Sequence, residues 1–174
     1  MRKDATLLLI MALSVVGCSH SSTVNKNSQG APSQASLEAK DTEGNSALLR
    51  AVNGGDTNEV RRLVEAGADV NSASNSGVTP LMNAAGMGNK EAVEFLIKKG
   101  ADVNHRTSGN YTALMQAALV GQTEIVKILL DAGADPAVKD AGGRTAMAYA
   151  QEQKHDEIAQ LLKQKTGSQS AGKN

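Results

Sequence analysis

The chain has 174 residues, a length that suits one domain with flanking segments rather than two full domains. It contains 18 Lys and Arg residues and 18 Asp and Glu residues, so it lacks the basic excess with which nucleic-acid-binding proteins hold phosphates. Its single cysteine excludes an internal disulfide bond and a zinc site built from several cysteines.

The N-terminal residues have the pattern of a secretory signal. Two positive charges, Arg2 and Lys3, precede an apolar run at residues 5–16. A helix of this run spans about 18 Å, which is too short for the roughly 30 Å hydrocarbon core of a bilayer. The pattern therefore predicts a cleaved signal peptide rather than a transmembrane helix.

The end of this run is more specific, because Val15-Val16-Gly17-Cys18 resembles the lipobox of bacterial lipoproteins. The resemblance implies that residues 1–17 are a lipoprotein signal peptide and that acyl chains such as palmitate anchor Cys18 in the membrane. In Gram-negative lipoproteins an Asp after the cysteine favours the inner membrane, so Ser19 implies the periplasmic face of the outer membrane. The alternatives are an ordinary signal peptide with a chance cysteine and an uncleaved anchor.

Residues 18–40 are rich in Ser, Asn and Gln and contain almost no large apolar side chains. Such a segment cannot bury enough apolar surface to fold. We therefore expect residues 18–40 to be a flexible tether between the lipidated cysteine and a folded domain.

The rest of the chain has a period of 33 residues, which is typical of a repeat array. Glycine, leucine and alanine recur at this spacing, and each unit offers a Ser or Thr as N-cap of a first helix, followed by a second, amphipathic helix. In the second helix of the first unit, Asp56 and Glu59 have the spacing of a capping box. The recurring residues are Gly44 and Gly77; Gly55, Gly88 and Gly121; Gly67, Gly100 and Gly133; Leu48, Leu81, Leu114 and Met147; and Ala51, Ala84, Ala117 and Ala150.

This pattern resembles the ankyrin repeat, D-x-x-G-x-T-P-L-x-x-A-A-x-x-G followed by V-x-x-L-L-x-x-G-A-D-x-N. The resemblance implies an all-α repeat solenoid, a stack of four helix-turn-helix units with projecting β-hairpin-like loops. The units are residues 41–73, 74–106, 107–139 and 140–165; the last is polar and predicted to cap the stack, and residues 166–174 are predicted to be a disordered tail. Asn110 replaces the turn glycine of the third unit, which predicts a reshaped loop.

No catalytic constellation is present in the sequence. The three histidines, His20, His105 and His155, are scattered over the predicted architecture and lack the spacing of metal ligands. There is no phosphate-binding loop and no nucleophile elbow. We therefore expect the chain not to be an enzyme and to hold no cofactor or metal.

Ankyrin arrays generally bind proteins through the concave surface that their loops and first helices form. At the variable positions of that surface this chain has apolar residues on its second and third units, with basic residues around them. The predicted partner-binding residues are Val78, Met87, Arg106, Tyr111, Leu119, Val120, Lys139 and Arg144. The alternative is that Leu119 and Val120 only pack the stack and that Val78 is incidental.

These observations predict a lipid-anchored periplasmic module, with a monomeric domain, that binds a protein partner and neither nucleic acid nor a small-molecule substrate. The partner would be a toxin, if the chain is an immunity protein, or a periplasmic enzyme, if the chain is its helper. The alternative is a structural or self-associating component of the envelope without a dedicated partner.

Overall fold

Short helices joined by turns and loops form the regular structure of the chain. The computed structural model describes residues 33–171, so the predicted signal peptide, the predicted lipidation site at Cys18 and most of the predicted tether lie outside it. The described residues contain helices and no β-strand. The helices are α1 (Gln34–Glu38), α2 (Ala47–Asn53), α3 (Thr57–Glu65), α4 (Pro80–Met87), α5 (Lys90–Lys98), α6 (Ala113–Val120), α7 (Thr123–Asp131), α8 (Ala146–Glu152) and α9 (Asp156–Ala171).

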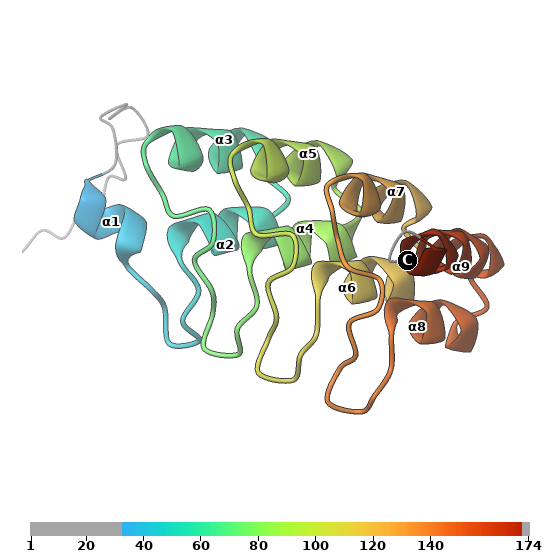
Figure 1. Ribbon diagram of the computed structural model, residues 1–174. Coiled ribbons are helices and arrows are strands. Elements are labelled where there is room, and N and C mark those ends of the chain that lie inside the picture. Colours follow the sequence, from blue (N-terminus) through green and yellow to red (C-terminus); the bar gives the residue numbers. More distant parts are fainter. Residues whose placement is uncertain (1–32, 172–174) are drawn as a thin grey trace, which may run out of the picture. The chain divides into compact units, whose positions relative to one another are not determined.

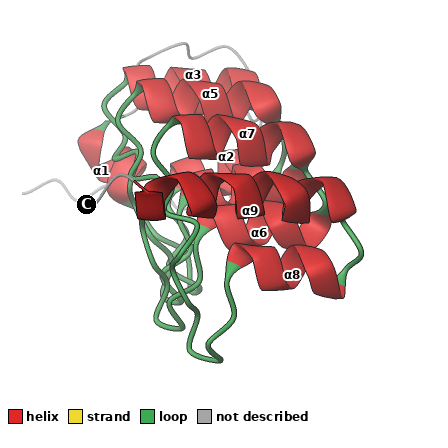
Figure 2. Cartoon of the chain, turned by 45° about the vertical axis from the view of Figure 1, so that its right-hand side comes forward, coloured by secondary structure: helices red, strands yellow, loops and turns green. Residues whose placement is uncertain are grey.

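Eight of these helices form two layers (Figure 1). Helices α2, α4, α6 and α8 pack side by side in what we call the inner layer, and α3, α5, α7 and α9 pack in the same order in the outer layer. Each inner helix also packs against the outer helix that follows it in the chain. The loops that enter the inner helices project together to one side (Figure 2). The arrangement confirms the predicted all-α stack of four helix-turn-helix units.

The inner helices begin where the sequence predicts because a hydroxyl group caps each first turn. The side chains of Ser46, Thr79, Thr112 and Thr145 each accept a hydrogen bond from a backbone N–H group three residues later. A cap of this kind contributes about 1 kcal/mol of stability. In α4, Pro80 occupies the first helical position, where its missing N–H group would have no partner within the helix.

The start of α3 follows the sequence-based expectation only in part. Asp56 caps the helix by accepting a hydrogen bond from the backbone N–H group of Glu59, as expected. The Glu59 carboxylate does not return to Asp56, as a full capping box would require. It binds the guanidinium group of Arg62, with both carboxylate oxygens 2.6 Å from its nitrogens.

Small side chains let neighbouring inner helices approach closely. Ala84 of α4 and Ala117 of α6 occupy the same repeat position and are completely buried. Leu81 and Leu114, which also share a position, are each only 1% exposed. Complete burial of a leucine side chain contributes about 2 kcal/mol. The recurrence of these residues therefore produces a continuous core along the stack.

The four projecting loops share one pattern of backbone hydrogen bonds, and the third loop follows it as well. There the N–H group of Thr107 donates to the carbonyl of Tyr111, and that of Asn110 donates to the carbonyl of Thr107; the other three loops have the equivalent pair. Asn110 has a φ of 58°, the left-handed conformation that glycine adopts in the other loops. The prediction of a reshaped third loop is wrong, because asparagine tolerates this conformation better than most residues.

Asparagine side chains in the connections that follow the outer helices join successive units by hydrogen bonds. The Asn71 amide oxygen accepts a hydrogen bond from the backbone N–H group of Asp102, at 2.8 Å, and its amide nitrogen donates to the carbonyl of Gly100. Asn104 makes the same two bonds to the next unit. Ala137 occupies this position in the third unit, and in the fourth unit α9 continues through the positions that would form the equivalent turn.

Both ends of the stack are helical where the sequence predicted flexible chain. Helix α1 lies inside the predicted tether, and its Leu37 side chain is only 3% exposed because it packs against the first unit. The Lys40 ammonium group also donates to the carbonyl of Ala73 at 2.9 Å. At the other end, α9 continues to Ala171, past the predicted start of the tail at residue 166.

Candidate functional site

Six of the eight residues predicted for binding lie in the loops and helices of the inner layer, and Arg106 and Lys139 directly precede two of the loops. We define the inner-layer face as the four loops at residues 41–45, 74–78, 107–111 and 140–144 together with the exposed residues of α2, α4, α6 and α8. The predicted residues fall into a few repeat positions: Val78, Tyr111 and Arg144; Met87 and Val120; Arg106 and Lys139; and Leu119 alone. Val78 and Tyr111 precede α4 and α6, whereas Met87 and Val120 end these helices. Each helix has eight residues, so the two positions are about 12 Å apart and the residues form rows rather than one cluster.

The row at the ends of α4 and α6 is the most exposed apolar part of this face. Met87 is 50% exposed and Val120 is 45% exposed, and they are the exposed large apolar residues of the part of the chain that the structure describes. Each is the last residue of its helix, and the two helices pack side by side. The flanking units have Gly54 and Gln153 at this position, so the apolar row is confined to the middle of the stack.

Three of the predicted apolar residues are instead partly incorporated in the core. Val78, Tyr111 and Leu119 are half-buried and pack against the buried residues of the stack. This is the packing role that the sequence left open for Leu119 and Val78. Val120, for which packing was the alternative as well, remains exposed.

Arg144 is not a free cation at the edge of the face. Its guanidinium group lies 3.1 Å from the Asp140 carboxylate and 3.6 Å from Glu152, and it covers the Tyr149 ring at 4.4 Å from the centroid. Tyr149 donates a hydrogen bond to Asp140, and with the Arg144 N–H groups this lowers the Asp140 pKa to about 2. Burial and the adjacent carboxylate raise the pKa of Tyr149 to about 12. Arg144 therefore stabilises its own unit.

Arg106 and Lys139 remain available. Both side chains are exposed, and neither takes part in any ion pair among the described residues. They occupy the same position in successive units, just before the third and fourth loops. A partner with acidic groups near these loops would find two cations without competing carboxylates.

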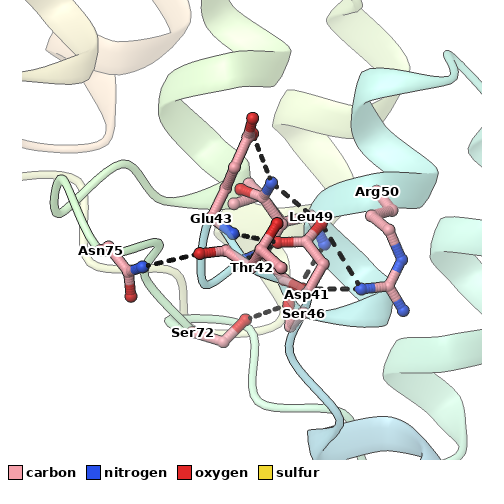
Figure 3. A network of polar contacts seen from close by, with 9 residues as sticks. Asp41, Thr42, Glu43, Ser46, Leu49, Arg50, Ser72 and Asn75 are labelled. Carbon is pink, nitrogen blue, oxygen red and sulfur yellow. Dashed lines mark hydrogen bonds and ion pairs between the residues drawn. The ribbon is translucent and has the colours of Figure 1, made fainter.

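A polar network fixes the first loop internally and to the second loop (Figure 3). The Asp41 carboxylate accepts hydrogen bonds from N–H groups of its own loop, of which the bond from Asn45 contributes most to lowering the Asp41 pKa. Arg50 lies 3.9 Å from the same carboxylate. The Asn75 side chain donates to the carbonyl of Thr42, which joins the two loop tips. The network holds neighbouring loops in a common orientation.

The sequence-based prediction missed a row of amide side chains on the inner helices. Asn83 of α4 donates a hydrogen bond to Asn53 of α2, and Gln116 of α6 lies against Gly86, where any Cβ atom would collide with it. Asn83 and Gln116 are half-buried and share one repeat position, which is taken by Tyr149 in the fourth unit. The 33-residue spacing of these polar residues was the available signal.

The described residues show no arrangement suited to metal binding, and no helix among them is both long and apolar enough to span a membrane. His105 lies in a connection between units and His155 at the start of α9, where its ring nitrogen Nε2 is 3.3 Å from the Leu119 carbonyl oxygen. The inner-layer face offers exposed apolar groups and amides, and the cations Arg106 and Lys139 directly precede its third and fourth loops. This set is suited to contacts with another macromolecule.

Comparison with known families agrees with the fold. A family profile described as ankyrin repeats (3 copies) matches residues 9–107, and a second, described as ankyrin repeats (many copies), matches residues 96–150. The chain therefore belongs to the ankyrin-repeat family. No curated protein matches the chain. Ankyrin repeats generally mediate protein–protein interaction and are typically not enzymes.

Proposed function

We propose that this chain is a lipid-anchored periplasmic protein that holds a protein partner through its inner-layer face. The observation that carries the proposal is the pair Met87 and Val120, two exposed apolar side chains at equivalent positions of adjacent helices. Isolated exposed apolar residues are ordinary, but a row of them beside half-buried apolar neighbours is typical of an interface. The partner is either a toxin or a periplasmic enzyme.

The anchoring half of the proposal comes from the sequence. The lipobox-like residues end at Cys18, the sole cysteine, and Ser19 favours the outer membrane. Acyl chains contribute about 0.8 kcal/mol for each buried CH₂ group, so several chains hold a protein firmly on a bilayer. Labelling cells with radioactive palmitate and separating detergent-rich from aqueous phases tests this step. Wild type should be labelled and enter the detergent phase, whereas Cys18→Ser should do neither.

The binding half is tested by affinity capture from the native envelope, with the full-length protein as bait. A Met87→Ser, Val120→Ser double variant should lose the partner and keep its thermal stability, because both side chains are already exposed. Tyr111 and Leu119 are left unchanged, since they pack against the core and their truncation would confuse binding with folding. Lys98→Ser, on the exposed surface of α5, is the matched control and should retain the partner.

The alternative of a self-associating envelope component makes an opposite prediction. Under that alternative, size-exclusion chromatography with light scattering would give oligomers, and the Met87→Ser, Val120→Ser variant would dissociate them. A monomer that captures one distinct protein supports the proposed function. Retention of the same proteins by wild type and the double variant would contradict it.

A further inference from the structure

The centre of the inner-layer face carries no ionic side chain. Residues 70–89 and 107–123 contain no Asp, Glu, Lys or Arg, and they include the second and third loops and the whole of α4 and α6. The charges of these two units lie on α5 and α7 and in the connections that follow these helices, at Lys99, Asp102, Arg106, Asp135 and Lys139. The absence of charge is therefore specific to one layer of the stack rather than a general feature of the chain.

The charges of the flanking inner helices are paired within their own units. The one charge of α2, Arg50, faces Asp41 at 3.9 Å. The one charge of α8, Glu152, faces Arg144 at 3.6 Å, and Arg144 also binds Asp140. These pairs reduce the field that a partner meets when it approaches α4 and α6. Arg106 and Lys139 lie beyond the opposite ends of these helices, on the side of the loops.

The accessible groups of this uncharged area include the exposed side chains of Met87 and Val120 and the half-buried amides of Asn83 and Gln116. Met87 and Val120 provide apolar contact, and Asn83 and Gln116 provide amide groups that donate and accept hydrogen bonds. Helices that pack side by side are about 8–10 Å apart, so equivalent residues of α4 and α6 are separated by a similar distance. A complementary partner segment would place one apolar side chain against Met87 and another, at this spacing, against Val120.

We propose that the segment of the partner protein that covers Met87 and Val120 is uncharged, with apolar side chains and amide or backbone groups at its contact surface. This inference rests on the proposed function. A charged partner group placed here would lose its water and find no opposite charge, which is a large cost. Docking at this area therefore depends little on ionic strength, because screening acts on charges.

The test places charges of both signs beside the contact. The full-length protein carries the photo-crosslinking residue p-benzoylphenylalanine in place of Met87, in cells, with Val120 unchanged or as V120E, V120K or V120Q. If the covering segment is uncharged, V120E and V120K should both lower the crosslink yield by about ten-fold, and V120Q by much less. Lys98→Glu on α5 is the control and should leave the yield unchanged; circular dichroism checks that each variant is folded.

The outcomes separate the two proposals. A partner that crosslinks from position 87 and is lost equally with either sign of charge at position 120 supports the inference. A crosslink that one sign of charge leaves intact or strengthens, or that maps to a charged partner segment, overturns the inference and keeps the proposed function. If a partner crosslinks only when the photo-crosslinking residue replaces Lys98, or if no partner crosslinks at all, both the inference and the proposed function are overturned.

Discussion

The aromatic rings of Tyr111 and Tyr149 meet edge to face, with their centroids 5.4 Å apart and their planes at 85°. The hydroxyl groups of the two residues have opposite environments. That of Tyr149 donates to Asp140 and accepts from Arg144. That of Tyr111 is buried, and no hydrogen-bond partner for it lies among the described residues. One pair of rings therefore contains a satisfied hydroxyl and an unsatisfied one.

This difference predicts opposite effects of the same substitution. Tyr111→Phe should raise the free energy of unfolding by about 1 kcal/mol, because it removes a buried polar group that gains nothing from the fold. Tyr149→Phe should lower it by about 2 kcal/mol, because it breaks hydrogen bonds to charged groups. Urea unfolding of residues 18–174 with Cys18→Ser measures both. Equal effects of the same sign would contradict the assignment of the two hydroxyl environments.

The lowered pKa of Asp140 predicts how the free energy of unfolding changes at acidic pH. Hydrogen bonds from Tyr149 and Arg144 hold its pKa at about 2, below the ordinary value of 3.8. Because the folded-state pKa is the lower one, the stabilisation is complete above the ordinary pKa and disappears as the pH falls through about 2. The difference in unfolding free energy between wild type and Asp140→Asn should therefore shrink from about pH 4 to about pH 2.

Urea titrations of residues 18–174 with Cys18→Ser at several pH values across that range measure the difference. Glu65→Gln, which changes an exposed carboxylate at the end of α3, is the control and should show a nearly constant difference. A constant difference for Asp140→Asn as well would mean that the Asp140 carboxylate is not the source of the acid sensitivity.

The left-handed backbone of Lys154 predicts that its substitution by glycine stabilises the fold. It has a φ of 60°, and the equivalent turns of the other units contain Gly55, Gly88 and Gly121 in the same left-handed conformation. An ordinary L-residue loses roughly 1–2 kcal/mol in this conformation, so Lys154→Gly should raise the melting temperature. Asn110→Gly should raise it less, because asparagine tolerates left-handed backbone. Lys154→Ala removes the charge but keeps the strain, and a gain as large as that of glycine would contradict the explanation.

The sequence predicted those features that the 33-residue period repeats. Hydroxyl caps such as Thr79 and glycines such as Gly100 meet a local backbone need, so a residue pattern suffices to place them. The exposure of Met87 and Val120 was predicted for the same reason, since the helix ends of a repeat stack are at known positions. Neither feature requires knowledge of which distant side chains touch.

The features that the sequence did not predict depend on contacts between particular side chains. Arg144 was expected at the rim of an interface, but Tyr149 and Asp140 bind it, and these contacts arise only when the fourth loop folds back on α8. Helix α1 was missed because five residues are too few to form a helix alone. It exists through its contact with the first unit, which a composition of Ser, Gln and Ala does not reveal.

That contact predicts that the folded module begins before the first repeat. Leu37 is 3% exposed and belongs to the core, so Leu37→Ala should lower the free energy of unfolding by about 2 kcal/mol, at the low end for a buried leucine because it lies at an end of the stack. Ala35→Ser, an exposed substitution in the same helix, should change it by less than about 0.5 kcal/mol.

Hydrogen exchange shows where the loss occurs. Since each unit of a repeat stack contacts only its neighbours, Leu37→Ala should accelerate amide exchange in α2 and α3 and leave α8 and α9 unchanged. Exchange that rises equally in all units would indicate that the stack unfolds as one body and that α1 stabilises it globally. Unchanged exchange in α2 would mean that α1 is not the N-terminal cap, and the module would then begin at the first repeat as the sequence predicted.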